Sequence, residues 1–183
     1  MQNYIAILRG INVSGQKIIK MAELRDHLAS LGFSNLVTYI QSGNIVFRSE
    51  AKENAVLEEM IHQNIKENYA FDVPVIVRSQ KEWQAVVDRF PFNLEDYDIK
   101  LIGVVYLKSP PAQIPTEEIN TYKATSDKIV YEEKEIYLYV PDGFGSSKLT
   151  NNVFERKLKM PSTTRNWKTT LKLLEMALAA TTA

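Results

Sequence analysis

The order in which short apolar runs alternate with amphipathic segments is the feature that most constrains the fold of this chain. In the first 77 residues, four apolar runs have the length of strands, and two segments repeat apolar residues along one helical face. The expected strands are 4–8, 36–40, 45–48 and 73–77, and the expected helices are 21–31 and 54–68. This order, β-α-β-β-α-β, is that of a ferredoxin-like unit.

Two local signals support this assignment. The segment 41–44, Gln-Ser-Gly-Asn, joins the second and third expected strands, and Gly43 and Asn44 accept the positive φ that tight hairpin turns require. Further along, Ser79 and Glu82 have the spacing of a capping box, in which each side chain accepts a hydrogen bond from the other residue's backbone amide. We therefore expect a hairpin at 41–44 and a helix that begins after Ser79.

After residue 97 the pattern begins again. The expected strands are 101–107, 129–131 and 136–140, and the expected helices are 116–122, 147–158 and one from about residue 165. This half has the order βαββα and lacks an obvious final strand. We therefore expect an α+β protein of two intertwined ferredoxin-like units, βαββαβ and βαββα, with helices packed on antiparallel sheets. The expected domains are 1–90, which includes the connecting helix, and 91–183, which includes the C-terminal helix.

Composition excludes several classes of function. The chain has 183 residues, a formal net charge of zero and no cysteine, so it has no disulfide, zinc–thiolate site or thiol nucleophile. His27 and His62 lie on expected helices without companions arranged as metal ligands. We therefore expect no metal site and no cofactor. No apolar run approaches the roughly 20 residues of a membrane span, and the first residues lack a signal-peptide pattern, so we expect a cytoplasmic protein without membrane contact.

Charge is distributed unevenly along the chain. Residues 91–142 carry 10 acidic and 5 basic side chains, whereas residues 143–183 carry 2 acidic and 7 basic ones. A net charge of zero argues against general binding to nucleic acids, but the basic C-terminal segment would favour an anionic partner. The alternative is that this segment packs beside the acidic one.

Polar loops follow two expected strands of the first half. These loops are 9–15 and the hairpin turn 41–44. Because the first and second strands of a ferredoxin-like unit run parallel, both loops leave the sheet at the same end. Their polar side chains suit an anionic or amide-bearing ligand and include no obvious catalytic base. The expected ligand-binding residues here are Arg9, Asn12, Gln41, Ser42 and Asn44. The alternative is that Asn12, Gly43 and Asn44 serve turn geometry. Arg9 would then cap a carbonyl group or pair with a nearby carboxylate.

A third polar loop, 143–150, leads into an expected helix. Its glycines would free backbone amides, and Ser147 and Lys148 would add a hydroxyl group and a cation at the helix N-terminus, as anion binding requires. It is not a Walker A loop, because the glycine spacing differs and Leu149 follows the lysine. The alternative is a helix capped by serine with a surface lysine.

The segment 161–167 is the fourth polar stretch. Arg165 and Asn166 would lie in the first turn of the last helix. A cation at that position opposes the helix dipole, so Arg165 is expected to face a partner or a carboxylate such as Glu155.

Five stretches of the sequence carry a family resemblance. They are YIAILRGINVSG, MAELRDHLASLGF, TYIQSGNIVF, YVPDGFGSSKLTNNVFERKL and TTRNWKTTLKLLEM, in this order from residue 4 to residue 176. Together they resemble the bacterial family called domain of unknown function 1697. The resemblance implies a small cytosolic protein of two intertwined ferredoxin-like units and brings no established activity. The signature positions that it implies are Arg9, Gly10, Asn12, Gln41, Ser42, Gly43, Asn44, Lys148, Thr150, Arg165, Asn166 and Trp167. Ser14 departs from the family pattern, which has glycine there.

Three functions are compatible with these features. The first is a binding protein, or an enzyme of unknown reaction, that recognises an anionic metabolite or nucleotide through the loops that contain Arg9, Lys148 and Arg165. The second is a nucleic-acid-binding protein, because sheet faces of ferredoxin-like folds can stack bases; Tyr39 and Phe47 are the candidate aromatics, or else core residues. The third is an interaction or structural protein that self-associates through its terminal helix. No residue is assigned a catalytic role.

Overall fold

The computed structural model describes residues 1–182, with side chains through residue 180, and divides into two compact units. Unit 1 comprises Met1–Ala85 together with the C-terminal segment from Lys172, and unit 2 comprises Val86–Leu171. The chain therefore crosses between the units twice. The division expected from the sequence grouped residues 91–183, whereas the segment from Lys172 lies in the same compact unit as Met1–Ala85.

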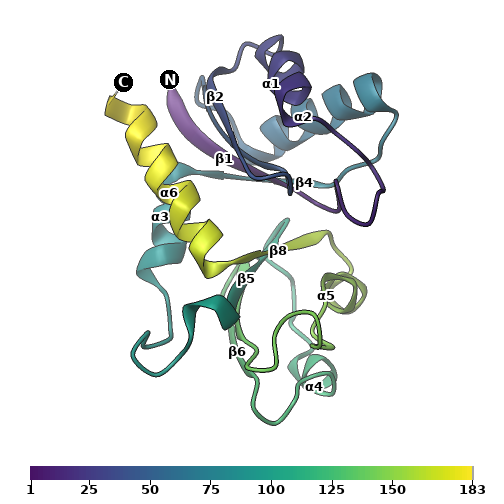
Figure 1. Ribbon diagram of the computed structural model, residues 1–183, viewed down its shortest axis with the longest axis vertical. Coiled ribbons are helices and arrows are strands. Elements are labelled where there is room, and N and C mark those ends of the chain that lie inside the picture. The colour runs from purple at the N-terminus through teal and green to yellow at the C-terminus, as the bar shows by residue number, and fades with distance from the viewer. Residues whose placement is uncertain (183) are drawn as a thin grey trace. The chain divides into compact units, whose positions relative to one another are not determined.

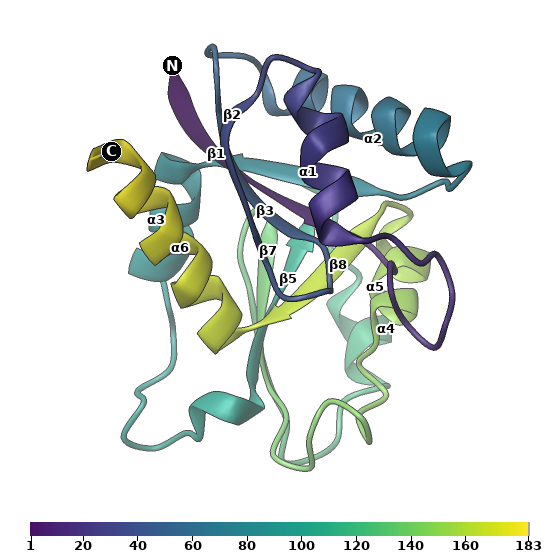
Figure 2. The ribbon, with the colours of Figure 1, turned by 45° about the horizontal axis from the view of Figure 1, so that its top comes forward.

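Unit 1 contains a four-stranded antiparallel sheet with two helices on one face (Figures 1 and 2). Its elements are β1 (Gln2–Leu8), α1 (Met21–Ala29), β2 (Ser34–Tyr39), β3 (Asn44–Ser49), α2 (Asn54–Tyr69) and β4 (Val75–Ser79). The strand order is β2-β3-β1-β4, and each neighbouring pair is antiparallel. Because β3 lies between them, β1 and β2 run parallel, as the element order predicted.

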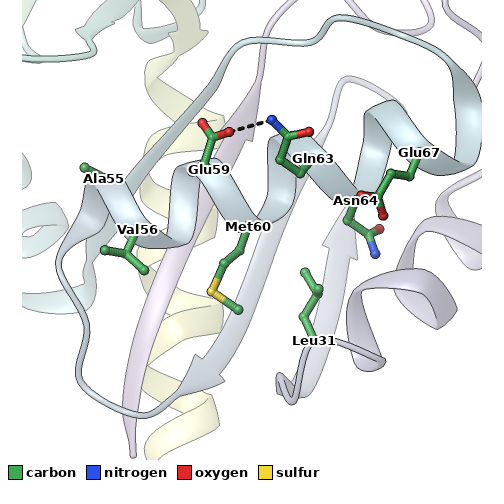
Figure 3. A pocket seen from close by; sticks show the side chains of 8 residues that line it. All are labelled: Leu31, Ala55, Val56, Glu59, Met60, Gln63, Asn64 and Glu67. Carbon is green, nitrogen blue, oxygen red and sulfur yellow. Dashed lines mark hydrogen bonds between the residues drawn. The ribbon is translucent and has the colours of Figure 1, made fainter.

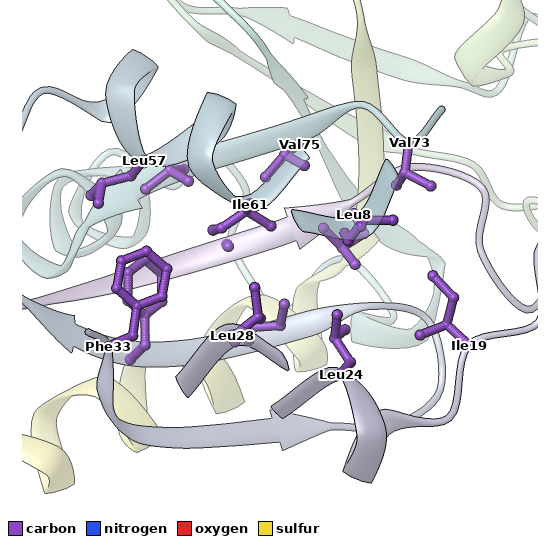
Figure 4. Packing of buried hydrophobic residues seen from close by; sticks show 14 of the residues in the cluster. Leu8, Ile19, Leu24, Leu28, Phe33, Leu57, Ile61, Val73 and Val75 are labelled. Carbon is purple, nitrogen blue, oxygen red and sulfur yellow. The ribbon is translucent and has the colours of Figure 1, made fainter. Parts of the chain in front are cut away.

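The core of unit 1 lies where α1 and α2 cover the sheet (Figure 4). Successive strand residues point to opposite faces, so Tyr4, Ala6 and Leu8 of β1 all point toward the helices and are buried. The two helices contribute Leu24, Leu28, Leu57 and Ile61. Burial of each large apolar side chain stabilises the fold by about 1.5–3 kcal/mol.

Unit 2 repeats this architecture. Its elements are η1 (Ile99–Leu101), β5 (Ile102–Leu107), α4 (Thr116–Asn120), β6 (Lys128–Tyr131), β7 (Glu135–Tyr139), α5 (Asn151–Leu158) and β8 (Ser162–Asn166). The strand order is β6-β7-β5-β8, again with antiparallel neighbours. Ile119 of α4 and Phe154 of α5 pack with Val105, Leu107 and Ile136 of the sheet. The α+β class with antiparallel sheets is thereby confirmed.

Two helices, α3 (Gln80–Asp88) and α6 (Trp167–Thr182), contain residues of both units. Their unit 2 residues lie on the sheet face opposite α4 and α5. There Tyr137 Oη donates to the carbonyl oxygen of Val86 at 2.6 Å. Tyr106 Oη and Thr170 Oγ1 lie 3.0 Å apart. Both faces of this sheet are therefore covered.

The final strand, β8, overturns the expected order βαββα of the second half. Residues 162–166 form a strand that pairs with β5, and Val104 lies opposite Arg165 in the register. The expectation was wrong because the serine and threonines resemble helix caps, whereas β-branched threonine also fits an edge strand. Asn166 caps α6 instead, because its Oδ1 accepts from the amide of Thr169 at 2.8 Å.

Two local predictions have different outcomes. The capping box is confirmed: Glu82 N donates to Ser79 Oγ at 3.2 Å, and Ser79 N donates to Glu82 Oε2 at 2.8 Å. In the hairpin, Gly43 has the expected positive φ of 77°, but Asn44 does not; the second left-handed residue is Ile40. Asn44 is instead the first residue of β3, where it pairs with Tyr39.

On one edge strand of each sheet, a backbone amide that points away from the sheet donates a hydrogen bond to a glutamate side chain. Glu58 of α2 accepts from the amide of Val77 in β4 at 3.0 Å, and its side chain is buried. Glu155 of α5 accepts from the amide of Ser162 in β8 at 3.1 Å. An unpaired buried amide costs about 1–3 kcal/mol, so these contacts stabilise the edges and block further strand pairing there.

Two tyrosines of unit 2 make the free energy of unfolding depend on pH in the alkaline range. Burial raises the pKa of Tyr131 to about 12, and it also raises the pKa of Tyr137. Between pH 10 and pH 12 the unfolded chain loses tyrosine protons that the folded chain keeps, so the free energy of unfolding falls as pH rises. Guanidinium denaturation at pH 9 and at pH 11.5 measures this effect. Tyr131→Phe should reduce the loss, and an unchanged loss in this variant would contradict the assignment.

Within residues 1–182, no helix combines the length and the apolar character required to cross a membrane.

Candidate functional site

The first two polar loops meet at one end of the sheet of unit 1, as the element order predicted. Ile7 pairs with Asn44 at the end of β1, and Tyr39 pairs with the same residue at the end of β2. The amide of Leu8 donates to the carbonyl oxygen of Gly43 at 2.8 Å. Asn12 Nδ2 donates to the carbonyl oxygen of Gln41 at 2.8 Å. The sequence therefore located this cluster of polar residues correctly.

The amides in this cluster hold the loops together. Asn12 has a left-handed φ of 53°, and its side chain bridges to Ile19, with Nδ2 donating to the carbonyl oxygen and Oδ1 accepting from the amide. Asn44 is buried, and its Nδ2 donates to Tyr39 O and to Ser42 Oγ, each at 3.0 Å. These contacts support the turn-geometry alternative for both asparagines. Arg9 is partly buried directly after β1.

The third polar loop lines a small cavity in unit 2. The cavity has a volume of about 220 Å³. Ser147 and Lys148 line it from the β7–α5 connection, and Tyr122 and Lys123 line it from the segment that follows α4. The remaining lining residues are Thr121, Ala124, Asp127, Val140, Asp142, Gly143 and Ser146. Two segments separated by more than ten residues therefore bring two lysines to one cavity.

The helix that follows this loop begins later than expected, at Asn151 rather than Ser147. Backbone amides of the loop are used inside it: those of Ser146 and Ser147 donate to the carbonyl oxygen of Gly143. The amide of Leu149 donates to Ser147 Oγ at 3.1 Å. These amides therefore already have acceptors within the loop. A ligand in the cavity would be contacted mainly by side chains.

The cavity lining is balanced in charge. Lys123 and Lys148 are its cations, and Asp127 and Asp142 are its anions. Asp127 is buried and accepts from the amide of Ala124 at 2.9 Å, which closes the turn before β6. Asp142 and Lys148 are exposed. The lining therefore offers both cationic donors and anionic acceptors, at a formal net charge of zero.

A second cavity, of about 390 Å³, lies against the same connection. It is lined by Phe144, Leu149, Thr150, Asn151, Thr164 and Asn166. Thr164 Oγ1 donates to Asn151 Oδ1 at 2.7 Å, which joins β8 to the start of α5. Gly103 makes room for the ring of Phe144, because a Cβ at residue 103 would lie 2.7 Å from Cζ of that ring. This cavity has no charged side chain in its lining.

The structure separates the four sequence-predicted residues of unit 2. Ser147 and Lys148 line the smaller cavity, and Asn166 lines the larger one. Arg165 was expected in the first turn of a helix but lies in β8, where it is 8% exposed. Its Nη1 donates to Thr163 Oγ1 at 2.8 Å and to Thr164 O at 3.0 Å.

Sequence reasoning missed the contribution of Lys123 and Asp142. Both are single charged residues in connections, and no motif distinguishes them from ordinary surface residues. The one available signal for Asp142 was its position directly before the glycine-rich loop. Among residues 1–182, no group of three or more His, Asp or Glu side chains is arranged to hold a metal ion.

The fold and these cavities define a class: an α+β protein of two βαββαβ units, with a small polar cavity beside the β7–α5 connection of the second. The chain belongs to the family described as "Protein of unknown function (DUF1697)", whose sequence profile matches residues 1–137. The profile match ends before Ser147 and Lys148.

The same fold is found in a solved structure, that of the conserved bacterial protein SP0830 from Streptococcus pneumoniae. It is 22% identical to this chain, the alignment covers 96% of this chain and 98% of that one, and the TM-score is 0.74. No curated protein is significantly similar to this chain in sequence.

Proposed function

We propose that this protein binds a small anionic metabolite in the cavity that Ser147 and Lys148 line. The observation that carries the proposal is that Lys123, from a separate segment, lines the same cavity. Charge-assisted hydrogen bonds from lysine to a carboxylate or phosphate are roughly twice as strong as neutral ones. Two lysines and the serine hydroxyls therefore provide donors for such a group.

The size of the cavity limits the ligand. Typical ligand pockets measure about 300–1,000 Å³, whereas this cavity measures about 220 Å³. Its volume suits a metabolite of a few heavy atoms better than a whole nucleotide. We therefore narrow the ligand class to small carboxylates and small phosphorylated compounds.

The aspartates refine the chemistry further. Asp142 and Asp127 would repel a ligand that is anionic throughout, and they accept hydrogen bonds. A ligand that carries a hydroxyl or an ammonium group in addition to its anionic group would use both kinds of lining residue. Hydroxy acids, amino acids and small phosphorylated alcohols have this composition.

The nucleic-acid alternative has less support. It requires exposed aromatic side chains on which bases can stack. Phe47 lies in the core of unit 1, 5.6 Å from the ring of Tyr4 and 4.5 Å from that of Phe33. In unit 2, Tyr106 and Tyr137 are also buried. Tyr39, the other candidate aromatic, is partly exposed, and a single ring supports base stacking less than several would.

Replacing Lys148 with alanine tests the proposal. The full chain is titrated by calorimetry with inorganic phosphate, a small phosphorylated alcohol, a hydroxy acid and an amino acid. Loss of one charge-assisted hydrogen bond costs about 1.5–3 kcal/mol, so Kd should rise about 10- to 100-fold in Lys148→Ala. Lys123→Ala should produce a similar loss for the same ligand.

Lys168→Ala is the matched control, because Lys168 is an exposed lysine of unit 2 that does not line the cavity. It should retain the wild-type Kd. If no compound of the panel binds to the wild-type chain, or if Lys148→Ala and Lys168→Ala bind alike, the proposal is wrong.

A further inference from the structure

The outer surface of α2 carries a wide groove that the candidate site does not use (Figure 3). Its volume is about 610 Å³, and it lies entirely within unit 1. The lining residues are Leu31, Ala55, Val56, Glu59, Met60, Gln63, Asn64 and Glu67. Seven of the eight therefore belong to one helix, and Leu31 stands opposite them after α1.

The lining forms two parallel rows along α2, because residues four apart lie on the same face of a helix. One row is Val56, Met60 and Asn64, and it faces Leu31 across the groove (Figure 3). Apart from Asn64 this row is apolar, and the side chain of Val56 is 48% exposed. Val56 therefore offers exposed apolar area to a partner, whereas Met60 and Leu31 are partly buried and also pack against the core of unit 1.

The second row forms an acidic rim. Glu59, Gln63 and Glu67 follow one another at intervals of four residues along the upper edge of the helix (Figure 3). Glu59 is 61% exposed. Both charged residues of the lining are acidic, and no lysine or arginine lines the groove. The charge of the rim therefore favours a basic partner.

Asn64 is the polar member of the first row. Its side chain is 7% exposed, and Nδ2 donates to the carbonyl oxygen of His27 at 3.3 Å. Within the described residues, Oδ1 has no hydrogen-bond partner. This oxygen is itself buried, and the burial of an acceptor without a partner costs about 1–3 kcal/mol.

We infer that this groove docks a basic amphipathic helix of a partner protein. The lining runs from Ala55 to Glu67, which corresponds to about 18 Å along the helix axis at a rise of 1.5 Å per residue. That length suits about three turns of a docked helix better than a small molecule. Helix-in-groove recognition places apolar side chains at i, i+3 or i+4 and i+7 in the groove. Lysine or arginine on the flank of such a helix would lie beside Glu59 and Glu67.

The test uses two synthetic helical peptides of about 15 residues, or four turns, with the same leucine face. One carries lysine on its flanks, and the other carries glutamate at the same positions. Fluorescence anisotropy with the full chain should show binding of the lysine peptide and at least tenfold weaker binding of the glutamate peptide. The methyl resonance of Met60 should shift when the lysine peptide binds.

The double variant Glu59→Lys/Glu67→Lys should reverse this preference, because it inverts the charge of the rim at exposed positions. Glu117→Lys/Glu133→Lys is the matched control: it changes the net charge equally at exposed positions in unit 2 and should bind like the wild type.

Three results would overturn the inference: equal binding of both peptides, an unchanged preference in the rim variant, or no shift of Met60. Light scattering distinguishes docking of a basic partner from docking of a second copy of this chain. A wild-type dimer that the rim variant dissociates would identify the groove as a self-association surface and refute the inference.

Discussion

Replacing Trp167 with alanine is expected to lower the free energy of unfolding by about 3–5 kcal/mol, the range for truncation of a buried tryptophan. Trp167 is 2% exposed and begins α6 directly after β8. Its ring stacks on that of Phe90, with 4.0 Å between the centroids. The alanine variant would leave a cavity on the sheet face where Tyr137 also packs, 6.5 Å from Trp167.

Guanidinium denaturation followed by circular dichroism measures this loss. Trp167→Phe is the matched variant, because phenylalanine keeps an aromatic ring for Phe90 to stack on and should therefore lose clearly less stability than alanine does. A loss below about 1 kcal/mol in Trp167→Ala would be typical of a surface position and would contradict this packing.

Gly43→Ala is the second change with a large expected effect. Gly43 has a φ of 77°, and a Cβ at this position would lie 2.6 Å from Leu8 Cβ and 2.9 Å from Ile11 Cδ1. The left-handed conformation costs a residue with a side chain about 1–2 kcal/mol, and overpacking of a core adds about 1–3 kcal/mol. We therefore expect the free energy of unfolding to fall by about 2–5 kcal/mol.

Gly15→Ala separates the two causes. Gly15 has a similar φ of 74°, but a Cβ there would meet no atom within 4 Å. It should therefore show the conformational cost alone. Thermal unfolding of both variants gives the comparison, and equal losses would show that the approach of Gly43 to Leu8 contributes nothing to stability.

The two polar-loop clusters illustrate how far the sequence predicted the candidate site. The contact between loops 9–15 and 41–44 followed from the parallel course of β1 and β2, which the element order implies. For Asn12 and Asn44, the sequence is compatible with both ligand binding and turn geometry. The structure supports the second, because the side chain of each asparagine makes hydrogen bonds that bridge backbone segments. Sequence position predicted where these side chains lie but not which groups they contact.

The cavity in unit 2 was less predictable from the sequence than the loop cluster of unit 1. Ser147 and Lys148 were candidates because they follow glycines, whereas Lys123 had no local signal. The cavity exists because the segment after α4 lies beside the β7–α5 connection. Such a contact between two irregular segments has no periodicity for a sequence pattern to reveal.

The alternation of strands and helices was determined by the sequence itself. Apolar periodicity located all six strands and helices of the first βαββαβ unit, and the spacing of Ser79 and Glu82 located the start of α3. These signals are local, because hydrogen bonding within a helix and the alternation of strand faces depend on neighbouring residues. Local patterns were therefore sufficient for the element order of the first unit.

Only the tertiary structure decided the role of residues 162–166. This polar segment, Ser-Thr-Thr-Arg-Asn, resembles a helix start, yet it forms β8 because β5 offers an unpaired edge and Glu155 accepts from the amide of Ser162. The partners of an edge strand lie far away in the sequence, so its pairing energy cannot be read from its own residues. For the same reason, the grouping of the segment from Lys172 with unit 1 became apparent only in the folded chain.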